Sequence, residues 1–263
     1  MSFDELFIRV ILGLIIGFFV GLTSIGSGVL VLPILSFLLK DITLAVGTTT
    51  LYAFLTKIFA SLNHIKLKTI NWNIVRSFLL GAIPSSAFFA LLVSSSLKSE
   101  FQTNLLKYII ISVILLSIIM MVLDTHKSKN TLNSDNFISK FINSNNKLRF
   151  FFAIFFGFIC GSLVGSTSIG AGIIVIPLLV ILFKLNTCEA VGTSIIMAFF
   201  MTMITAVIFG LNGQQDYQTA ILMSVGSLVG VFYGSKLSII LSDLILRITV
   251  ITLMAIGLVI MIL

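Results

Sequence analysis

Residues 7–39 read FIRVILGLIIGFFVGLTSIGSGVLVLPILSFLL, and this stretch decides the fold. From residue 10 to residue 39 it carries no charged side chain, and charge-free apolar runs of about 18 residues or more are candidates to cross a membrane. As one α-helix the whole stretch would be about 50 Å long, whereas the hydrocarbon core of a bilayer is about 30 Å thick. The chain must therefore bend within it, and the sequence TSIGSG at residues 23–28 predicts the place of the break.

The composition of the whole chain agrees with a membrane protein. Of the 263 residues, 58% are hydrophobic and only 10% are charged, whereas a soluble globular protein has about a quarter of its residues charged. Further charge-free runs cover residues 77–97, 150–183, 190–215 and 217–235. These features exclude soluble, fibrous and disordered proteins and predict an all-α protein that crosses the membrane several times.

The chain carries a formal net charge of +7. In a soluble domain this would suggest a nucleic-acid partner, but the cytoplasmic loops of membrane proteins collect Lys and Arg, so we expect no nucleic acid to bind. Cys160 and Cys188 stand apart from each other and from any His/Cys cluster, so they predict neither a metal site nor a disulfide. Two acidic residues precede Arg9 and no cleavage site follows, so we expect no signal peptide.

The chain contains two related halves. The sequence GSG at residues 26–28 recurs as GAG at residues 170–172, and each is followed five residues later by proline. The sequence AVGT at residues 45–48 recurs 145 residues later, at 190–193. Because matching runs in one order are hard to obtain from apolar composition alone, we infer an internal duplication.

We expect a first transmembrane repeat over residues 1–123, a polar basic linker over 124–149 and a second repeat over 150–263. The linker holds five basic residues, which predicts a cytoplasmic segment, with a short amphipathic helix around Phe137–Ile142. Each half resolves into five apolar segments. They lie near 7–22, 25–39, 44–63, 77–96 and 105–123 in the first half, and near 150–165, 169–184, 189–210, 217–235 and 245–263 in the second.

The bent pair of segments sets the orientation of the halves. Whether each pair crosses the membrane twice or enters and returns, both of its ends emerge on one side, so each half crosses an odd number of times and the second half is inverted. With the N-terminus outside, inversion leaves 11 basic residues in inside loops and four outside, whereas a parallel arrangement leaves nine and six. Because cytoplasmic loops are enriched in Lys and Arg, the count favours inverted repeats with broken or re-entrant helices at the two glycine motifs.

The two breaks predict a binding site. Inverted repeats with interrupted helices are a known transporter plan, with the substrate near the middle of the membrane. Glycines let the backbone come close to a ligand, and free N–H groups at a helix start bind anions. We therefore predict a substrate site from the breaks, the two Gly-Thr motifs and one lysine: Thr23, Ser24, Gly26, Ser27, Gly28, Thr48, Thr49, Lys57, Thr167, Ser168, Gly170, Gly172, Thr193 and Ser194.

Each part of this site has a structural alternative. Small residues at the breaks can simply permit close helix packing in lipid, and the hydroxyls of the Gly-Thr motifs can cap helices or bond to the preceding turn. Lys57 lies inside the apolar segment 51–62 and is a functional candidate for that reason. Alternatively its stem reaches the interface near His64, roughly 10 Å further along a helix.

The residue types exclude or disfavour other classes of protein. No Asp or Glu falls inside a predicted span, and Asp41, Glu189 and Asp216 stand at the edges, so the carboxylate relays of many proton-driven pumps have no evident counterpart. A membrane enzyme would need clustered acids, histidines or cysteines, and the two histidines are well separated. A passive scaffold remains an alternative, but it would leave the two breaks unexplained. We expect a transporter with no metal site and no cofactor.

The chain resembles the sulfite exporter TauE/SafE family of bacterial inner-membrane proteins, also called the toluene-sulfonate uptake permease family. The resemblance is carried by Gly26-Ser27-Gly28 with Pro33, by Ala45-Val46-Gly47-Thr48, by Asn71-Trp72 after a basic loop, and by their second copies. The stretch Leu51–Lys57 is similar to a subgroup with a lysine there, although Thr49 stands where that subgroup often has an acid.

The resemblance implies a multi-pass protein of the inner (plasma) membrane that transports a small sulfur-containing oxyanion or organosulfonate, such as sulfite or sulfoacetate, often outward. The nearer alternatives are another small organic anion, a neutral solute or a cation. The partners expected are this anion and the lipid bilayer, and the oligomeric state is left open.

Overall fold

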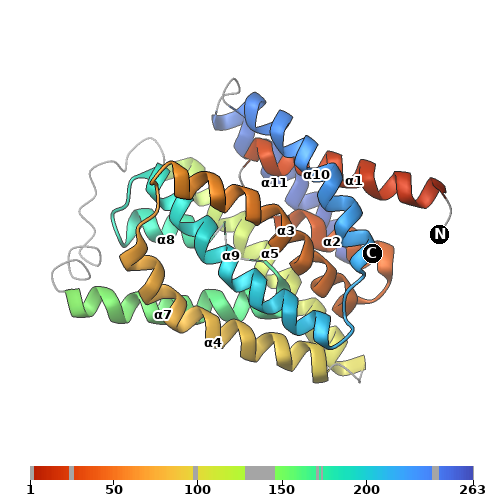
Figure 1. Ribbon diagram of the computed structural model, residues 1–263, viewed down its shortest axis with the longest axis horizontal. Helices are drawn as coiled ribbons and strands as arrows, with labels where there is room; N and C mark the ends of the chain where they lie inside the picture. Colours follow the sequence, from red (N-terminus) through yellow and green to blue (C-terminus); the bar gives the residue numbers. More distant parts are fainter. Residues whose placement is uncertain are drawn as a thin grey trace.

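The computed structural model is a bundle of α-helices (Figure 1). It describes residues 3–23, 27–96, 100–127, 146–169, 172, 174–238 and 243–262. Within these ranges every regular element is a helix. The helices are α1 (Phe3–Thr23), α2 (Ser27–Leu39), α3 (Ile42–Lys66), α4 (Trp72–Ser96), α5 (Glu100–Lys127), α7 (Asn146–Thr167), α8 (Val175–Ile181), α9 (Thr187–Leu211), α10 (Tyr217–Ser238) and α11 (Asp243–Ile262).

The long apolar stretch at the start of each half is divided into two helices at the predicted place. In the first half α1 ends at Thr23 and α2 begins at Ser27, and in the second half α7 ends at Thr167 and α8 begins at Val175. Helices α5 and α7 both extend into the range expected for the linker. The amphipathic helix expected around Phe137–Ile142 lies outside the described residues.

The helices have the length and surface of membrane spans. Within the described ranges, five segments are long and apolar enough to cross a bilayer: Ile42–Lys66, Trp72–Ser95, Asn146–Thr167, Glu189–Leu211 and Tyr217–Gly234. Large apolar side chains such as Phe88, Phe155 and Phe232 are more than half exposed on the outside of the bundle. Soluble proteins rarely expose extensive apolar surface, whereas lipid accommodates it. The protein is an all-α polytopic membrane protein, as the composition predicts.

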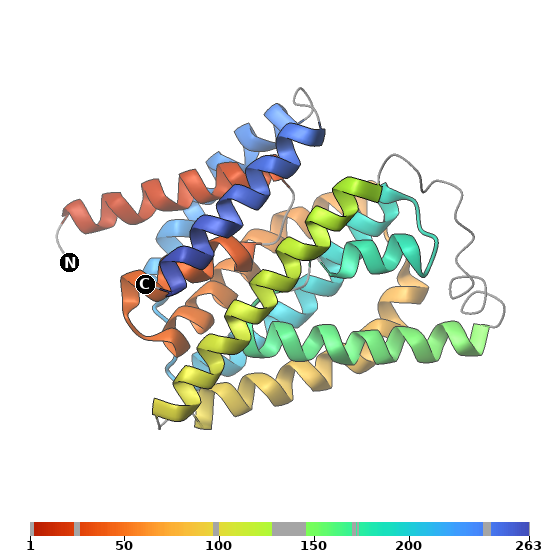
Figure 2. The same cartoon turned by 180° about the vertical axis from the view of Figure 1, so that it is seen from behind.

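The first helix of each half packs along the fourth helix of the other half. Helix α1 lies against α10 and α7 lies against α4, and these two pairs form opposite edges of the bundle with α3 and α9 between them (Figure 1). Helices α1 and α7 run in opposite directions in both views (Figures 1 and 2). The two halves therefore exchange equivalent contacts instead of packing as separate units.

Glycines allow the backbones of both helix pairs to touch. A Cβ atom added at Gly157 would lie 2.1 Å from the carbonyl oxygen of Phe78, and one added at Gly13 would lie 2.1 Å from that of Met223. Gly13 is the equivalent of Gly157, and Phe78 is the equivalent of Met223, in the alignment of the halves. Small residues of this kind let transmembrane helices approach closely, so the same packing device serves both edges.

Helices α3 and α9 meet at their midpoints. The ring centroids of Phe54 and Phe199 are 5.5 Å apart, and each residue is the middle one of a helix of 25 residues. The two phenylalanines are also equivalent in the alignment, at an offset of 145. Contact between equivalent residues half-way along the central helices is what a pseudo-twofold arrangement of the two halves would produce.

The orientation of the halves in a membrane can be tested by labelling. In a variant without Cys160 and Cys188, a cysteine at exposed Asn212 should react with a membrane-impermeant maleimide from outside. A cysteine at exposed Lys68, in the equivalent loop of the first half, should react only after the membrane is permeabilised. Labelling of both positions from the same side would contradict the inverted arrangement.

Candidate functional site

The second break is shaped by the end of α7. Ser168 follows the helix with a positive φ of 59°, and its N–H donates to the carbonyl of Val164 at 2.8 Å, which is the bond of a left-handed helix cap. The Thr167 hydroxyl donates to Leu163 (2.7 Å) and accepts from the N–H of Ile169 (3.1 Å). The Ser168 hydroxyl is buried and has no hydrogen-bond partner, so it is the group at this break that a ligand could use.

The first break lies against the second. A Cβ atom added at Gly28, in the first turn of α2, would be 2.1 Å from the carbonyl oxygen of Ser168 and 3.3 Å from the Cα of Ile169. The fold therefore brings the two break motifs together, although Gly28 and Ser168 are 140 residues apart in the sequence. Only a residue without a side chain permits this approach.

The remaining break residues are only partly described. Ser24, Gly26 and Gly170 lie outside the described residues, and for Thr23 and Ser27 the structure places only the backbone, at the end of α1 and the start of α2. Gly172 is half-buried. Their part in the predicted site stays a prediction.

The first hydroxyl of each Gly-Thr motif holds a loop in place. The N–H of Asp216 donates to the Thr48 hydroxyl at 3.0 Å, and the N–H of Asn71 donates to the Thr193 hydroxyl at 3.0 Å. Thr48 also donates to the carbonyl of Leu44 at 2.6 Å. In this conformation both threonines therefore position the loop before a fourth helix, which is the structural alternative for these residues.

The next hydroxyl differs between the two motifs. Ser194 donates to the carbonyl of Val191 at 2.8 Å within its own helix. Thr49, its equivalent in α3, is fully buried and its hydroxyl has no hydrogen-bond partner. Leaving a polar group unsatisfied in a protein interior costs about 1–3 kcal/mol, so a bound ligand that accepts from Thr49 would recover that free energy.

Two more buried hydroxyls lie here that the sequence reasoning missed. Tyr52 is one turn after Thr49 on α3, and its hydroxyl lies near that of Ser227 on α10. The pair does not complete a hydrogen bond, and both groups are buried. The position equivalent to Tyr52 in the second half holds Met197, and the position equivalent to Ser227 in the first half holds Ala82. A comparison of the halves position by position would have found both residues, since each is polar where its counterpart is apolar.

Lys57 lies close to the middle of the bundle. It is three residues after Phe54, the midpoint of α3, and its ammonium group is directed back along the helix, 3.5 Å from the carbonyl oxygen of Ala53. This direction is away from His64 and from the nearer end of the helix. No acidic side chain in the described part of the chain forms an ion pair with it. The conformation therefore differs from the one that snorkelling to the His64 interface would require.

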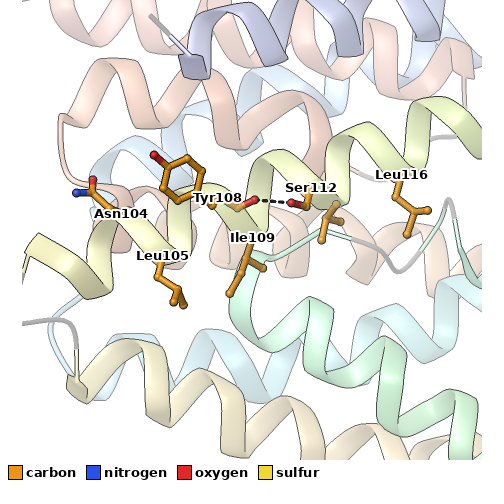
Figure 3. Close-up of a pocket in the computed structure, with 7 residues that line it drawn as sticks. Asn104, Leu105, Tyr108, Ile109, Ser112 and Leu116 are labelled. Carbon is orange, nitrogen blue, oxygen red and sulfur yellow. Dashed lines mark hydrogen bonds between the residues drawn. The ribbon is translucent and has the colours of Figure 1, made fainter.

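The groove in Figure 3 is an apolar surface of one helix, unlike the buried polar groups at the breaks. It has a volume of about 580 Å³ and its residues all come from α5, among them Leu105, Tyr108 and Ser112. The Ser112 hydroxyl donates to the carbonyl of Tyr108 at 2.8 Å, and Leu105 and Tyr108 are widely exposed. An apolar outer face of this kind suits lipid and offers few donors to an anion, so we do not place the substrate there.

The chemistry of the site is that of binding. The predicted site residues offer hydroxyls, backbone amides and one ammonium group, and in the described part of the chain the buried hydroxyls of Thr49, Tyr52, Ser168 and Ser227 form no hydrogen bond to a carboxylate or histidine. Among the described residues, no three His, Cys, Asp or Glu side chains gather in one place. These groups can hold an acceptor-rich ligand, but they do not form a nucleophile and base pair.

Comparisons with known proteins agree with this architecture. Residues 9–261 match the family model described as Sulfite exporter TauE/SafE. The chain is 30% identical over 233 residues to the probable membrane transporter protein YjnA of Bacillus subtilis, covering 87% of this chain and 89% of that protein. It is 27% identical over 241 residues to the probable membrane transporter protein YunE of the same organism, covering 88% and 86%. No solved structure gives a significant match.

Proposed function

Because this chain belongs to the sulfite exporter TauE/SafE family and is a membrane transporter, we propose that it exports a small sulfur-containing oxyanion or organosulfonate, such as sulfite or sulfoacetate, across the plasma membrane. The observation that carries the proposal is the contact of the two helix breaks at Gly28 and Ser168. Breaks of this kind are tolerated at membrane depth only where they are buried in protein or line a cavity.

The buried hydroxyls without a hydrogen-bond partner suit an oxyanion. Thr49, Tyr52, Ser168 and Ser227 each have a buried hydroxyl without a hydrogen-bond partner. The oxygens of a sulfite or sulfonate group accept hydrogen bonds and donate none when ionised, so hydroxyls and backbone N–H groups complement them. Lys57 would supply a positive charge near the same depth. We propose that this set, together with the other predicted break residues, binds the anion.

The direction of transport follows from the charge of the substrate. A cell interior that is negative favours the exit of a monovalent anion by about 2.3 kcal/mol per 100 mV. An anion can therefore leave without a proton relay, and the acids nearest the predicted spans, Asp41, Glu189 and Asp216, stand only at their edges. The proposed function includes no chemical step.

Flux into proteoliposomes tests the proposal. The purified chain should transport sulfite, thiosulfate or sulfoacetate faster than protein-free liposomes, with a rate that depends on a potential set by valinomycin, and it should not transport a cation of similar size. Flux of the cation but of none of the anions would overturn the proposed substrate class. Flux of a neutral organic solute alone would favour the alternative that the protein transports a neutral solute.

Replacing Tyr52 by phenylalanine tests its hydroxyl with little change in shape. A hydrogen bond to a charged group contributes about 1.5–3 kcal/mol, so the half-saturating anion concentration for flux should rise about tenfold or more. The thermal midpoint of the protein should stay the same or rise, because an unsatisfied buried hydroxyl is removed. Met197→Leu, at the equivalent position, is the control and should leave the half-saturating concentration unchanged. An unchanged value for Tyr52→Phe would remove Tyr52 from the site.

A further inference from the structure

A separate polar pocket lies where α4 and α7 begin. It has a volume of about 310 Å³ and is formed by both halves of the chain. The first half contributes Asn71, Asn73 and Ser77, and the second contributes Asn146, Arg149 and Phe183. The predicted substrate residues around Gly28 and Ser168 are not among those that line it.

Arg149 is the charged group of this pocket, and its guanidinium is poorly satisfied. One terminal nitrogen donates to the carbonyl of Phe183 at a long 3.4 Å, and the guanidinium carbon lies 5.9 Å from the centre of the Phe183 ring. The Nε group is buried and has no hydrogen-bond partner. No carboxylate in the described ranges forms an ion pair with Arg149.

The equivalent place at the other end of the bundle is neutralised. There Arg9 forms an ion pair with Asp216 at 3.2 Å. Burial alone would raise the pKa of Asp216, but hydrogen bonds from Thr219 and the charge of Arg9 lower it overall, so the carboxylate stays ionised. Asn71 is the counterpart of Asp216 in the alignment, and it stands in the Arg149 pocket. The position of the acid that pairs with Arg9 thus holds an amide in the Arg149 pocket.

We propose that this pocket binds an oxyanion, with Arg149 as its principal ligand. A guanidinium presents a planar fork of donors that matches sulfonate, sulfate or phosphate oxygens. The Asn71 side-chain oxygen accepts from the N–H of Ile74 at 3.3 Å, which leaves the amide nitrogen as a further donor. The shared chemistry fits both a soluble oxyanion and the phosphate of an acidic lipid.

The pocket is also connected to the predicted substrate site. The N–H of Asn71 donates to Thr193 at 3.0 Å, in the Gly-Thr motif that opens α9. Asn71, which lines the pocket with Arg149, therefore joins the pocket to that motif. The pocket serves as a vestibule for the transported anion on the side of the linker. This last assignment rests on the proposed function, whereas oxyanion binding itself does not.

The single tryptophan of the chain provides a built-in probe of this pocket. Trp72 stands between Asn71 and Asn73 in sequence and is 43% exposed. In the full chain reconstituted in phosphatidylcholine nanodiscs, quenching of its fluorescence by iodide, an anion, is compared with quenching by neutral acrylamide. Arg149→Met should lower the iodide quenching constant roughly twofold, since a nearby charge raises the local anion concentration by about that factor. Acrylamide quenching should not change.

Competition identifies the source of the oxyanion. Sulfate at constant ionic strength should protect Trp72 from iodide quenching in the wild type and not in Arg149→Met, and this result would assign a soluble ligand. Protection only by added phosphatidylglycerol would instead assign a lipid phosphate. Arg9→Met, which removes an arginine at the opposite end, should quench like the wild type. Equal iodide quenching in Arg149→Met and the wild type, or protection by neither anion, would contradict the proposal that the pocket binds an oxyanion. Sulfate protection without flux of sulfite, thiosulfate or sulfoacetate would support the oxyanion pocket and contradict the proposed function.

Discussion

Replacing Gly28 by alanine is expected to reduce anion flux about a hundredfold, the size of effect that a displacement of about 1 Å has at a reaction site. The new Cβ atom would lie 2.1 Å from the carbonyl oxygen of Ser168, so the backbones of the two breaks must separate. This separation displaces the Ser168 hydroxyl relative to the start of α2. Flux per folded protein in proteoliposomes, with protein levels matched, measures the effect.

A loss of flux could also come from general destabilisation, and Gly81 provides the matched control. A Cβ atom at Gly81 would lie 2.1 Å from the carbonyl oxygen of Ile154, which is an equally close backbone contact between α4 and α7 but far from Gly28 in the fold. Gly81→Ala should lower the thermal midpoint about as much as Gly28→Ala and retain most of its flux. If both variants lose flux to the same extent, Gly28 acts through packing alone and the site does not include it.

Much of the architecture could be predicted from the sequence, because it depends on local and simple quantities. The stretch 7–39 is too long for one bilayer span, and the structure divides it between Thr23 and Ser27, where the glycine and hydroxyl residues cluster. The alignment of the halves also indicates that contacts should come in equivalent pairs. The pairs Asn71–Thr193 and Asp216–Thr48 are such a case.

The roles of individual hydroxyls could not be predicted, because they depend on partners that are distant in sequence. Thr48 and Thr49 are neighbours with the same side chain, yet Thr48 accepts from Asp216, 168 residues away, and Thr49 has no partner. The sequence does not single out Tyr52, because an aromatic residue in an apolar helix is usually a packing residue. Its importance comes from Ser227, which only the folded chain brings near it.

Replacing Lys57 by methionine is expected to reduce anion flux more than about a hundredfold. Methionine keeps the apolar stem and deletes the charge, and a single charge pair at 4 Å contributes about 4 kcal/mol where the effective dielectric constant is 20. The ammonium group lies 3.5 Å from the Ala53 carbonyl oxygen, near the midpoint of α3 at Phe54. Lys57→Arg should retain part of the flux, because the charge stays while the donor geometry changes.

Thr202 is the residue on α9 equivalent to Lys57 and provides the control position for it. It is buried, and its hydroxyl donates within its own helix to the carbonyls of Ala198 (2.8 Å) and Phe199 (3.2 Å). Thr202→Val should therefore insert, fold and transport like the wild type, and the contrast with Lys57→Met would isolate the charge. If Lys57 served only to reach the interface near His64, Lys57→Met would transport normally at matched protein levels. That outcome would leave the hydroxyls and backbone N–H groups at the breaks to bind the anion without a charged partner.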